Sequence, residues 1–196
     1  MKIGIISENK NDSIAIGGLL KKQYHDVVFS PILPDFTGDS LDDKNSNKVI
    51  LTLRRNFEIY QPDFILYIRD LDASIEDKIK ITFRKKRFQK FKKVVDGKAI
   101  FMLNIYELET LILADFDTFK ILNNNENWFF EAKNASTTPE PDKILSKFTD
   151  YDKGEARIII PQLSFEKILE NHIHFRNFIL EFEKMLANKR FRSTPY

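Results

Sequence analysis

Short apolar runs alternate with longer segments of helical character through the first 125 residues of the chain. Strands are expected at residues 2–7, 27–33, 64–68 and 99–105. Helices are expected between and after these strands, at residues 12–24, 49–60, 75–95 and 107–122. Strands that are continuously apolar are typical of a parallel sheet covered on both faces. This order of elements predicts an α/β protein with a mainly parallel, Rossmann-like sheet flanked by helices.

The rest of the chain predicts a helical extension. Two polar stretches, residues 34–48 and 123–142, are expected to be loops. A short helix is expected at 143–148, and an amphipathic helix over 165–186 closes the fold. We therefore expect an α/β core of residues 1–125 and a C-terminal extension of residues 126–196 that packs on it as one structural unit.

Composition removes several classes of protein. The chain has no cysteine, which excludes disulfides and thiolate metal sites. Its start turns polar too soon for a signal peptide, and no apolar stretch approaches the roughly 20 residues of a membrane span. We expect a cytoplasmic protein without a membrane partner. No Gly-rich phosphate-binding loop is present, so any ATP hydrolysis would belong to a partner protein.

Acidic residues follow three of the predicted strands. Glu8 follows the first strand, Asp70 and Asp72 follow the third, and Glu107 and Glu109 follow the fourth. In open α/β sheets, ligands bind beyond the carboxyl ends of the strands, and Mg²⁺ prefers oxygen ligands. Residues two apart in an extended segment point the same way, so Asp70 and Asp72 are expected to face one ion. The joint pattern predicts a site for one or two Mg²⁺ or Mn²⁺ ions.

Each acid taken alone has a simpler explanation. An acid at a strand end is often a turn residue or a helix cap. Glu107 and Glu109 would stand in the first turn of a helix, where acids interact favourably with the helix dipole. On a regular helix these two side chains also diverge. Only the combination of three acidic strand ends favours the metal site over these structural roles.

The arrangement of a strand ending in Glu, a helix and a strand ending in Asp-x-Asp resembles the Toprim domain. That domain occurs in topoisomerases, bacterial primases and the overcoming-lysogenization-defect (OLD) nucleases. The stretch "YELETLILAD" (106–115) is similar to a Glu-Leu-Glu-x-x-Leu-Leu-Ala-Asp motif of small Toprim-like proteins, some of which are paired with ABC-type ATPases in bacterial abortive-infection systems. "YDKGEA" (151–156) and "HFRNFILEFEKML" (174–186) are similar to the same group. The resemblance extends from about Lys2 to Leu186.

The resemblance implies a metal-dependent nuclease and assigns roles to individual residues. The metal ligands that it implies are Glu8, Asp12, Asp70, Asp72, Glu107 and Glu109. Glu8 is either a ligand or the general base, and Lys153 is expected beside the scissile phosphate. Asn9 stands where the family usually has glycine, and asparagine tolerates a left-handed backbone better than most residues. Near Leu111 the family usually has tryptophan, which is expected to be a packing difference.

The predicted helix after Asp72 is strongly basic. Residues 78–93 contain nine Lys or Arg and no acid, with phenylalanines between them. One interpretation is contact with the phosphate backbone of a nucleic acid. The residues expected to make that contact are Arg84, Lys85, Lys86, Arg87 and Lys90. The alternative is a solvated helix face whose phenylalanines pack on the core.

These patterns lead to one main hypothesis and two alternatives. The main hypothesis is a Mg²⁺- or Mn²⁺-dependent Toprim-type nuclease that acts on DNA or RNA in bacterial anti-phage defence. The first alternative is a catalytically degenerate, Toprim-like interaction subunit that regulates, or is regulated by, an ABC-type ATPase partner. A receiver-like signalling domain is the second, but the Glu-Leu-Glu helix and the C-terminal extension have no place in it. His25, His172 and His174 lack ligand spacing and are expected on the surface or in packing roles.

Overall fold

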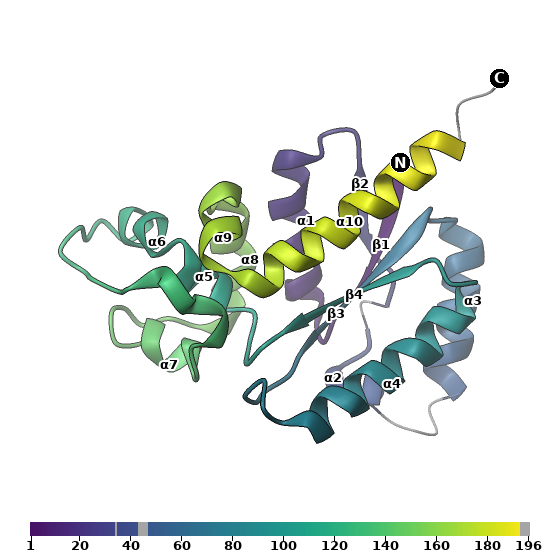
Figure 1. The fold of residues 1–196 in the computed structure, drawn as a ribbon, viewed down its shortest axis with the longest axis horizontal. Helices are drawn as coiled ribbons and strands as arrows, with labels where there is room; N and C mark the ends of the chain where they lie inside the picture. The colour runs from purple at the N-terminus through teal and green to yellow at the C-terminus, as the bar shows by residue number, and fades with distance from the viewer. Residues whose placement is uncertain (34, 43–46, 193–196) are drawn as a thin grey trace.

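Four parallel strands form the central sheet of the computed structural model, which describes residues 1–33, 35–42 and 47–192 (Figure 1). The strands are β1 (Lys2–Ile6), β2 (Val28–Pro31), β3 (Phe64–Asp70) and β4 (Ala99–Asn104). Their order is β2-β1-β3-β4, and every neighbouring pair is parallel. The predicted α/β class, with a Rossmann-like parallel sheet, is confirmed. The four strands begin and end within two residues of the expected positions.

Helices cover both faces of the sheet, as the apolar strands require. On one face, α1 (Lys10–Gln23) and α10 (Ile173–Arg192) share a hydrophobic cluster with Phe64, Leu66 and other strand residues. On the other face, α3 (Asn47–Tyr60) and α4 (Lys78–Val94) form a second cluster with Tyr67 and its neighbours. Successive side chains of a strand point to opposite faces, so β3 contributes to both clusters.

The C-terminal part of the chain consists of short helices that lead into α10 (Figure 1). In chain order these are α5 (Thr110–Ala114), α6 (Phe116–Leu122), η1 (Ala132–Thr137), α7 (Pro141–Leu145), η2 (Lys153–Glu155), α8 (Ala156–Ile159), η3 (Ile160–Gln162) and α9 (Phe165–Asn171). The first hydrophobic cluster includes residues from Ile3 to Leu186. The ring of Phe182 lies 5.8 Å from the ring of Phe64, which brings α10 onto β3. Sheet and extension therefore share one core.

Two helices expected to be continuous are interrupted. The helix expected at 107–122 is divided into α5 and α6 at Asp115, whose side chain accepts a hydrogen bond from the backbone N–H of Thr118 and so caps α6. The same carboxylate accepts a hydrogen bond at 2.7 Å from the backbone N–H of Ser164. The helix expected at 165–186 is divided at His172. Both interruptions arise from side-chain contacts that helical periodicity does not encode.

Both expected loops contain helical segments, since η1 and the start of α7 also fall within residues 123–142. Residues 38–42, within the polar stretch 34–48, form the short helix α2 (Gly38–Asp42), while residues 34 and 43–46 lie outside the described part. Leu41 is its buried residue. The short helix expected at 143–148 is α7, which begins and ends earlier. Among the described residues, no helix is long and apolar enough to cross a membrane.

Candidate metal centre

A pocket of about 270 Å³ opens beyond the carboxyl ends of β1, β3 and β4. The strand order changes direction between β1 and β3, and such a switch point is where open α/β sheets bind ligands. The pocket brings together all the acids that the sequence proposed as metal ligands, and the proposed phosphate-binding lysine. These lining residues are Glu8, Asp12, Asp70, Asp72, Glu107, Glu109 and Lys153. Residues far apart in the sequence therefore share one concave site.

Asp70 is the last residue of β3 and the acid most affected by its surroundings. Its Oδ1 accepts a hydrogen bond at 2.8 Å from Nδ2 of Asn104, its register partner on β4. Removal from water raises the pKa of Asp70 well above its usual range, and the negative charges of Glu8, Asp12 and Glu109 raise it further. Asp70 therefore lies where negative charge accumulates and a cation is favoured.

Asp12 and Glu109 also carry raised pKa values. Asp12 lies in the first turn of α1, where its backbone N–H donates to the side chain of Asn9 at 3.1 Å. Burial, followed by the charge of Glu8, raises the pKa of Asp12 to about 6. Burial raises the pKa of Glu109 to about 7, with a further contribution from Glu107. The protein thus keeps three acids in an environment that disfavours their charge.

Glu107 and Lys153 form an ion pair at this pocket. Nζ of Lys153 lies 2.6 Å from Oε1 of Glu107 and 3.4 Å from Oδ2 of Asp142. Burial lowers the pKa of Lys153, but its hydrogen bond to Glu107 and the nearby acidic charges outweigh that effect and raise the pKa overall. The other oxygen of Glu107, Oε2, is buried and has no hydrogen-bond partner among the described residues. A buried acceptor without a partner is unfavourable unless a ligand satisfies it.

Glu8, two residues beyond β1, is held from two directions. Its Oε1 accepts one hydrogen bond from the backbone N–H of Asp70 and another from Nε of Arg69, both at 2.9 Å. Its Oε2 lies against Gly38, where an added Cβ would come within 2.9 Å of that oxygen. Arg69 is only 1% exposed. The carboxylate of Glu8 is therefore fixed between the ends of β1 and β3.

Asp72 departs from the extended geometry that the sequence suggested. Its φ is +51°, in the left-handed region, so its side chain is not related to that of Asp70 by the two-residue repeat of a strand. Its backbone N–H donates to the carbonyl of Tyr106 at 2.9 Å. Its carboxylate pairs with Nη2 of Arg84 at 3.3 Å and is about half exposed. The segment is therefore not extended at Asp72 as expected, but both residues line the same pocket.

A buried histidine ties the C-terminal extension to the acidic turn. Nδ1 of His172 accepts a hydrogen bond from the backbone N–H of Phe175 at 3.0 Å, which leaves the proton on Nε2. Nε2 lies 3.0 Å from Oγ1 of Thr110, and that hydroxyl donates to the carbonyl of Glu107 at 2.7 Å. Burial lowers the pKa of His172 to about 3, so the ring is neutral. This histidine has a structural position beside the site.

The basic helix α4 presents lysines outward and arginines inward. Lys85, Lys86 and Lys90 are exposed, whereas Arg84 and Arg87 are buried. Their guanidinium groups are buried and do not reach the exposed face of the helix. Arg84 and Arg87 are therefore not part of the expected nucleic-acid surface. The physical reason is that each arginine has a partner in the protein. Arg84 pairs with Asp42 and Asp72, and Arg87 donates to the carbonyl of Leu41 from Nε at 2.9 Å and from Nη2 at 2.5 Å.

Three residues that shape the site were not found from the sequence. Asn104 orients Asp70, Arg69 holds Glu8, and Asp42 accepts from Arg69 at 3.0 Å. Arg69 had a detectable signal, because a charged residue directly after the apolar run "FILYI" needs a buried partner. Asn104 and Asp42 had none, since polar residues at the ends of strands and helices are common.

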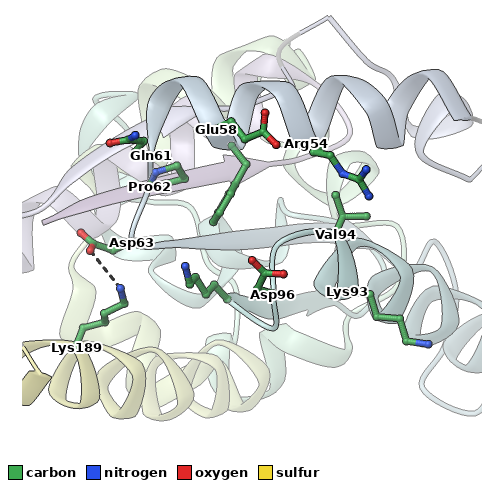
Figure 2. Close-up of a pocket in the computed structure, with 11 residues that line it drawn as sticks. Arg54, Glu58, Gln61, Pro62, Asp63, Lys93, Val94, Asp96 and Lys189 are labelled. Atoms are coloured by element: carbon green, nitrogen blue, oxygen red, sulfur yellow. Dashed lines mark hydrogen bonds and ion pairs between the residues drawn. The ribbon is translucent and has the colours of Figure 1, made fainter.

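A larger hollow lies at the opposite, amino ends of β3 and β4 (Figure 2). It has a volume of about 670 Å³ and is lined by side chains of both charges. Asp63 pairs there with Lys189 at 3.4 Å, and Nζ of Lys98 lies 5.6 Å from the ring centre of Phe57. Because ligands of open α/β sheets bind at the carboxyl ends of the strands, the acidic pocket is the better candidate site.

The donor set of the acidic pocket fits a hard divalent cation. It consists of carboxylates, which Mg²⁺ and Mn²⁺ prefer, and it includes a buried carboxylate oxygen that has no partner within the described part of the chain. In the arrangement described, no three His, Cys, Asp or Glu side chains of the described residues are grouped closely enough to ligate one ion. Glu8, Asp72 and Glu107 are instead paired with Arg69, Arg84 and Lys153.

Comparisons of the chain with protein-family models, with curated proteins and with solved structures gave no match.

Proposed function

We propose that this chain is a divalent-metal-dependent nuclease of Toprim type that hydrolyses phosphodiester bonds of DNA or RNA. We further propose that it acts in the cytoplasm, in bacterial anti-phage defence, as the resemblance of its motifs implies. The observation that carries the nuclease proposal is the convergence of acids from three strand ends, with Lys153, on one pocket at the switch point of the sheet. No simpler structural role requires that convergence.

Asp72 would hold the cation together with the acids whose pKa values are raised. These are Asp12, Asp70 and Glu109, with Glu107 adding its unpaired oxygen. One or two bound Mg²⁺ or Mn²⁺ ions would supply an activated water and charge stabilisation for the leaving oxygen. Bound cations would also favour the ionised forms of these acids, which burial disfavours.

Lys153 and Glu8 have distinct roles in this proposal. Lys153 keeps its charge at neutral pH because of its acidic neighbours. It can exchange Glu107 for a phosphate oxygen and neutralise negative charge there. Glu8 is fixed by Arg69 and by the backbone of Asp70. It is either a further ligand or the group that accepts a proton from the attacking water.

The exposed lysines of α4 are proposed to contact the nucleic acid. Lys85, Lys86 and Lys90 are exposed on the helix that follows the Asp70–Asp72 segment. Their contact with phosphates would be electrostatic and independent of sequence. This surface does not include Arg84 and Arg87, which are buried.

A second candidate function has an observation of its own. Glu8 pairs with Arg69, and Asp72 pairs with Arg84. In such a site the arginine charges neutralise the acids in place of a metal ion. That arrangement favours a catalytically degenerate interaction subunit that regulates, or is regulated by, an ABC-type ATPase partner. The two functions differ in a measurable property, because only the nuclease requires a metal.

Mn²⁺ titration by calorimetry, run beside a cleavage assay on DNA and RNA, separates the two functions. We expect the wild type to bind Mn²⁺ and cleave at least one substrate, and Asp70→Asn to do neither. Glu126→Gln, at an exposed acid outside the pocket, is the matched control and should behave as the wild type. Binding of Mn²⁺ without cleavage of any nucleic acid would favour the interaction subunit. A wild type that binds no Mn²⁺ would rule out the metal-dependent nuclease.

A further inference from the structure

Two buried arginines connect the pocket to an acid outside it. Asp42 is the last residue of α2 and is not among the residues that line the pocket. Its Oδ2 accepts a hydrogen bond from Nη2 of Arg69 at 3.0 Å and also pairs with Nη1 of Arg84. One carboxylate therefore lies between two guanidinium groups that come from different elements, β3 and α4.

Each of these arginines reaches a different acid of the pocket with its remaining nitrogens. Arg69 donates from Nε to Oε1 of Glu8 at 2.9 Å. Arg84 lies with Nη2 at 3.3 Å from Oδ2 of Asp72. The result is a continuous chain of charges from Glu8 through Arg69, Asp42 and Arg84 to Asp72, which we name the Asp42 bridge.

Burial makes the Asp42 bridge sensitive to the loss of a single charge. The side chains of Arg69 and Arg84 are 1% and 9% exposed. A buried guanidinium needs its anionic partners, because removal of one leaves charge that water does not compensate. Without the charge of Asp42, each arginine would keep only its pocket acid and would compete more strongly with a cation for that acid.

We propose that Asp42 is a positioning residue for the metal centre. Asp42 pairs with both Arg69 and Arg84, and so weakens the hold of these arginines on Glu8 and Asp72, which leaves the two acids able to bind a divalent cation. This inference rests on the proposed function, since it concerns the same site. It assigns to α2, a helix within a polar stretch of the sequence, control over two acids that lie on different strand ends.

Other contacts hold α2 in place, so the charge of Asp42 can be removed without undocking the helix. Arg87 donates twice to the carbonyl of Leu41, at 2.9 and 2.5 Å. Nη1 of Arg69 donates to the carbonyl of Gly38 at 3.4 Å. The side chain of Leu41 is fully buried. In Figure 1, α2 lies beside α4, as these contacts require.

The test measures Mn²⁺ affinity by calorimetry for the wild type, Asp42→Asn and Asp39→Asn. Asp39 is exposed on the same short helix and is the matched control. We expect Asp42→Asn to weaken Mn²⁺ binding by about tenfold to a hundredfold, the usual effect of losing an outer partner of a ligand. Asp39→Asn should leave the affinity unchanged. Asp42→Glu, which restores the charge, should recover part of the loss.

A double-mutant comparison separates positioning from general damage. If Asp42 acts through Arg84, the loss of affinity caused by Asp42→Asn should shrink in an Arg84→Gln background, because coupled residues are not additive. Equal losses in both backgrounds would contradict the proposal. So would a folded Asp42→Asn protein that binds Mn²⁺ as tightly as the wild type.

Three further outcomes are also decisive. If Asp42→Asn does not fold, Arg84→Lys carries the same test, because a lysine cannot bridge Asp42 and Asp72 as a guanidinium does; unchanged affinity there would overturn the inference. If the wild type itself binds no Mn²⁺, the proposed function fails first and the role of Asp42 fails with it. If the wild type binds Mn²⁺ and the Asp42 variants bind it equally tightly, the metal site stands and this inference alone is wrong.

Discussion

Oε1 of Glu8 accepts a hydrogen bond from the backbone N–H of Asp70 at 2.9 Å. The acid that follows β1 is thus attached to the residue that ends β3, across the point where the strand order changes direction. A carboxylate in this position adds negative charge beside a second carboxylate that already has a raised pKa. The arrangement disfavours the charge of Asp70, and it is the arrangement expected where a cation binds.

Asp70→Asn is expected to have opposite effects on stability and on metal binding. The amide keeps an oxygen for the hydrogen bond from Asn104 and removes a charge that burial and three neighbouring acids disfavour. The metal-free variant should therefore unfold at the same temperature as the wild type, or a few degrees higher. Mn²⁺ should raise the melting temperature of the wild type only. A metal-free variant that melts far below the wild type would identify Asp70 as a structural cap.

The raised pKa values of Glu109 and Asp12 are expected to stabilise the metal-free protein as the pH falls from about 8 to about 5, against an opposing contribution from His172 below about pH 6.5. The pKa of Glu109 is about 7 in the folded state and that of Asp12 about 6, above their ordinary values of 4.5 and 3.8. In that pH window the folded state binds more protons than the unfolded state, so acidification stabilises it. Glu109 alone should contribute about 2 kcal/mol across this range. Urea unfolding at several pH values measures the effect. Glu109→Gln is the control, and its stability should depend less on pH.

Mn²⁺ should suppress this pH dependence, because a bound cation keeps the acids ionised. Urea unfolding in saturating Mn²⁺ is expected to show the highest stability near pH 8 rather than near pH 5. If the metal-free wild type and Glu109→Gln instead show the same dependence of stability on pH between 8 and 5, Glu109 is ionised without a cation, and the metal proposal loses this electrostatic support.

His172 is expected to lower the stability of the protein as the pH falls below about 6.5. Its pKa is about 3 in the folded state, against 6.5 ordinarily. Between these values the unfolded state binds the proton and the folded state does not, so this contribution to stability falls as the pH drops below 6.5. The loss amounts to about 2 kcal/mol at pH 5. NMR titration should show the ring neutral down to pH 4, and a midpoint near 6 would contradict its burial.

Replacing Lys85, Lys86 and Lys90 with Glu is expected to weaken nucleic-acid binding and to flatten its dependence on salt. These side chains are exposed, so the free energy of unfolding should change by no more than about 0.5 kcal/mol. Fluorescence anisotropy with labelled DNA and RNA at several salt concentrations provides the measurement. Lys133 and Lys147 are exposed elsewhere, and their replacement with Glu is the control. Equal affinities for the two variants would make α4 a solvated face.

The strands and the acids at their ends were predictable because both follow from local patterns. A continuous apolar run such as residues 64–68 identifies a buried strand in any parallel sheet. The position of acids relative to strand ends then places Glu8, Asp70 and Glu107 at one edge without knowledge of strand order. The residues that line the pocket agree with that reasoning.

The remaining features depend on contacts between distant segments. Asp115 divides a periodic helix because Ser164, far along the chain, donates to its carboxylate. Asp72 adopts a left-handed backbone while its N–H bonds to the carbonyl of Tyr106. Arg84 looked like a surface cation within a basic run, yet Asp42 draws it inward. No spacing in the sequence encodes any of these partners.

The link from His172 through Thr110 to the carbonyl of Glu107 sets an order of events during synthesis. The strands and the acids Glu8 and Asp70 leave the ribosome early. The Glu107–Glu109 turn lacks its inner support until residue 175 has emerged, because the N–H of Phe175 is what orients the imidazole. A nascent chain that has emerged only as far as β4 therefore has the sheet without the support of the acidic turn, and α10 completes that side of the candidate site.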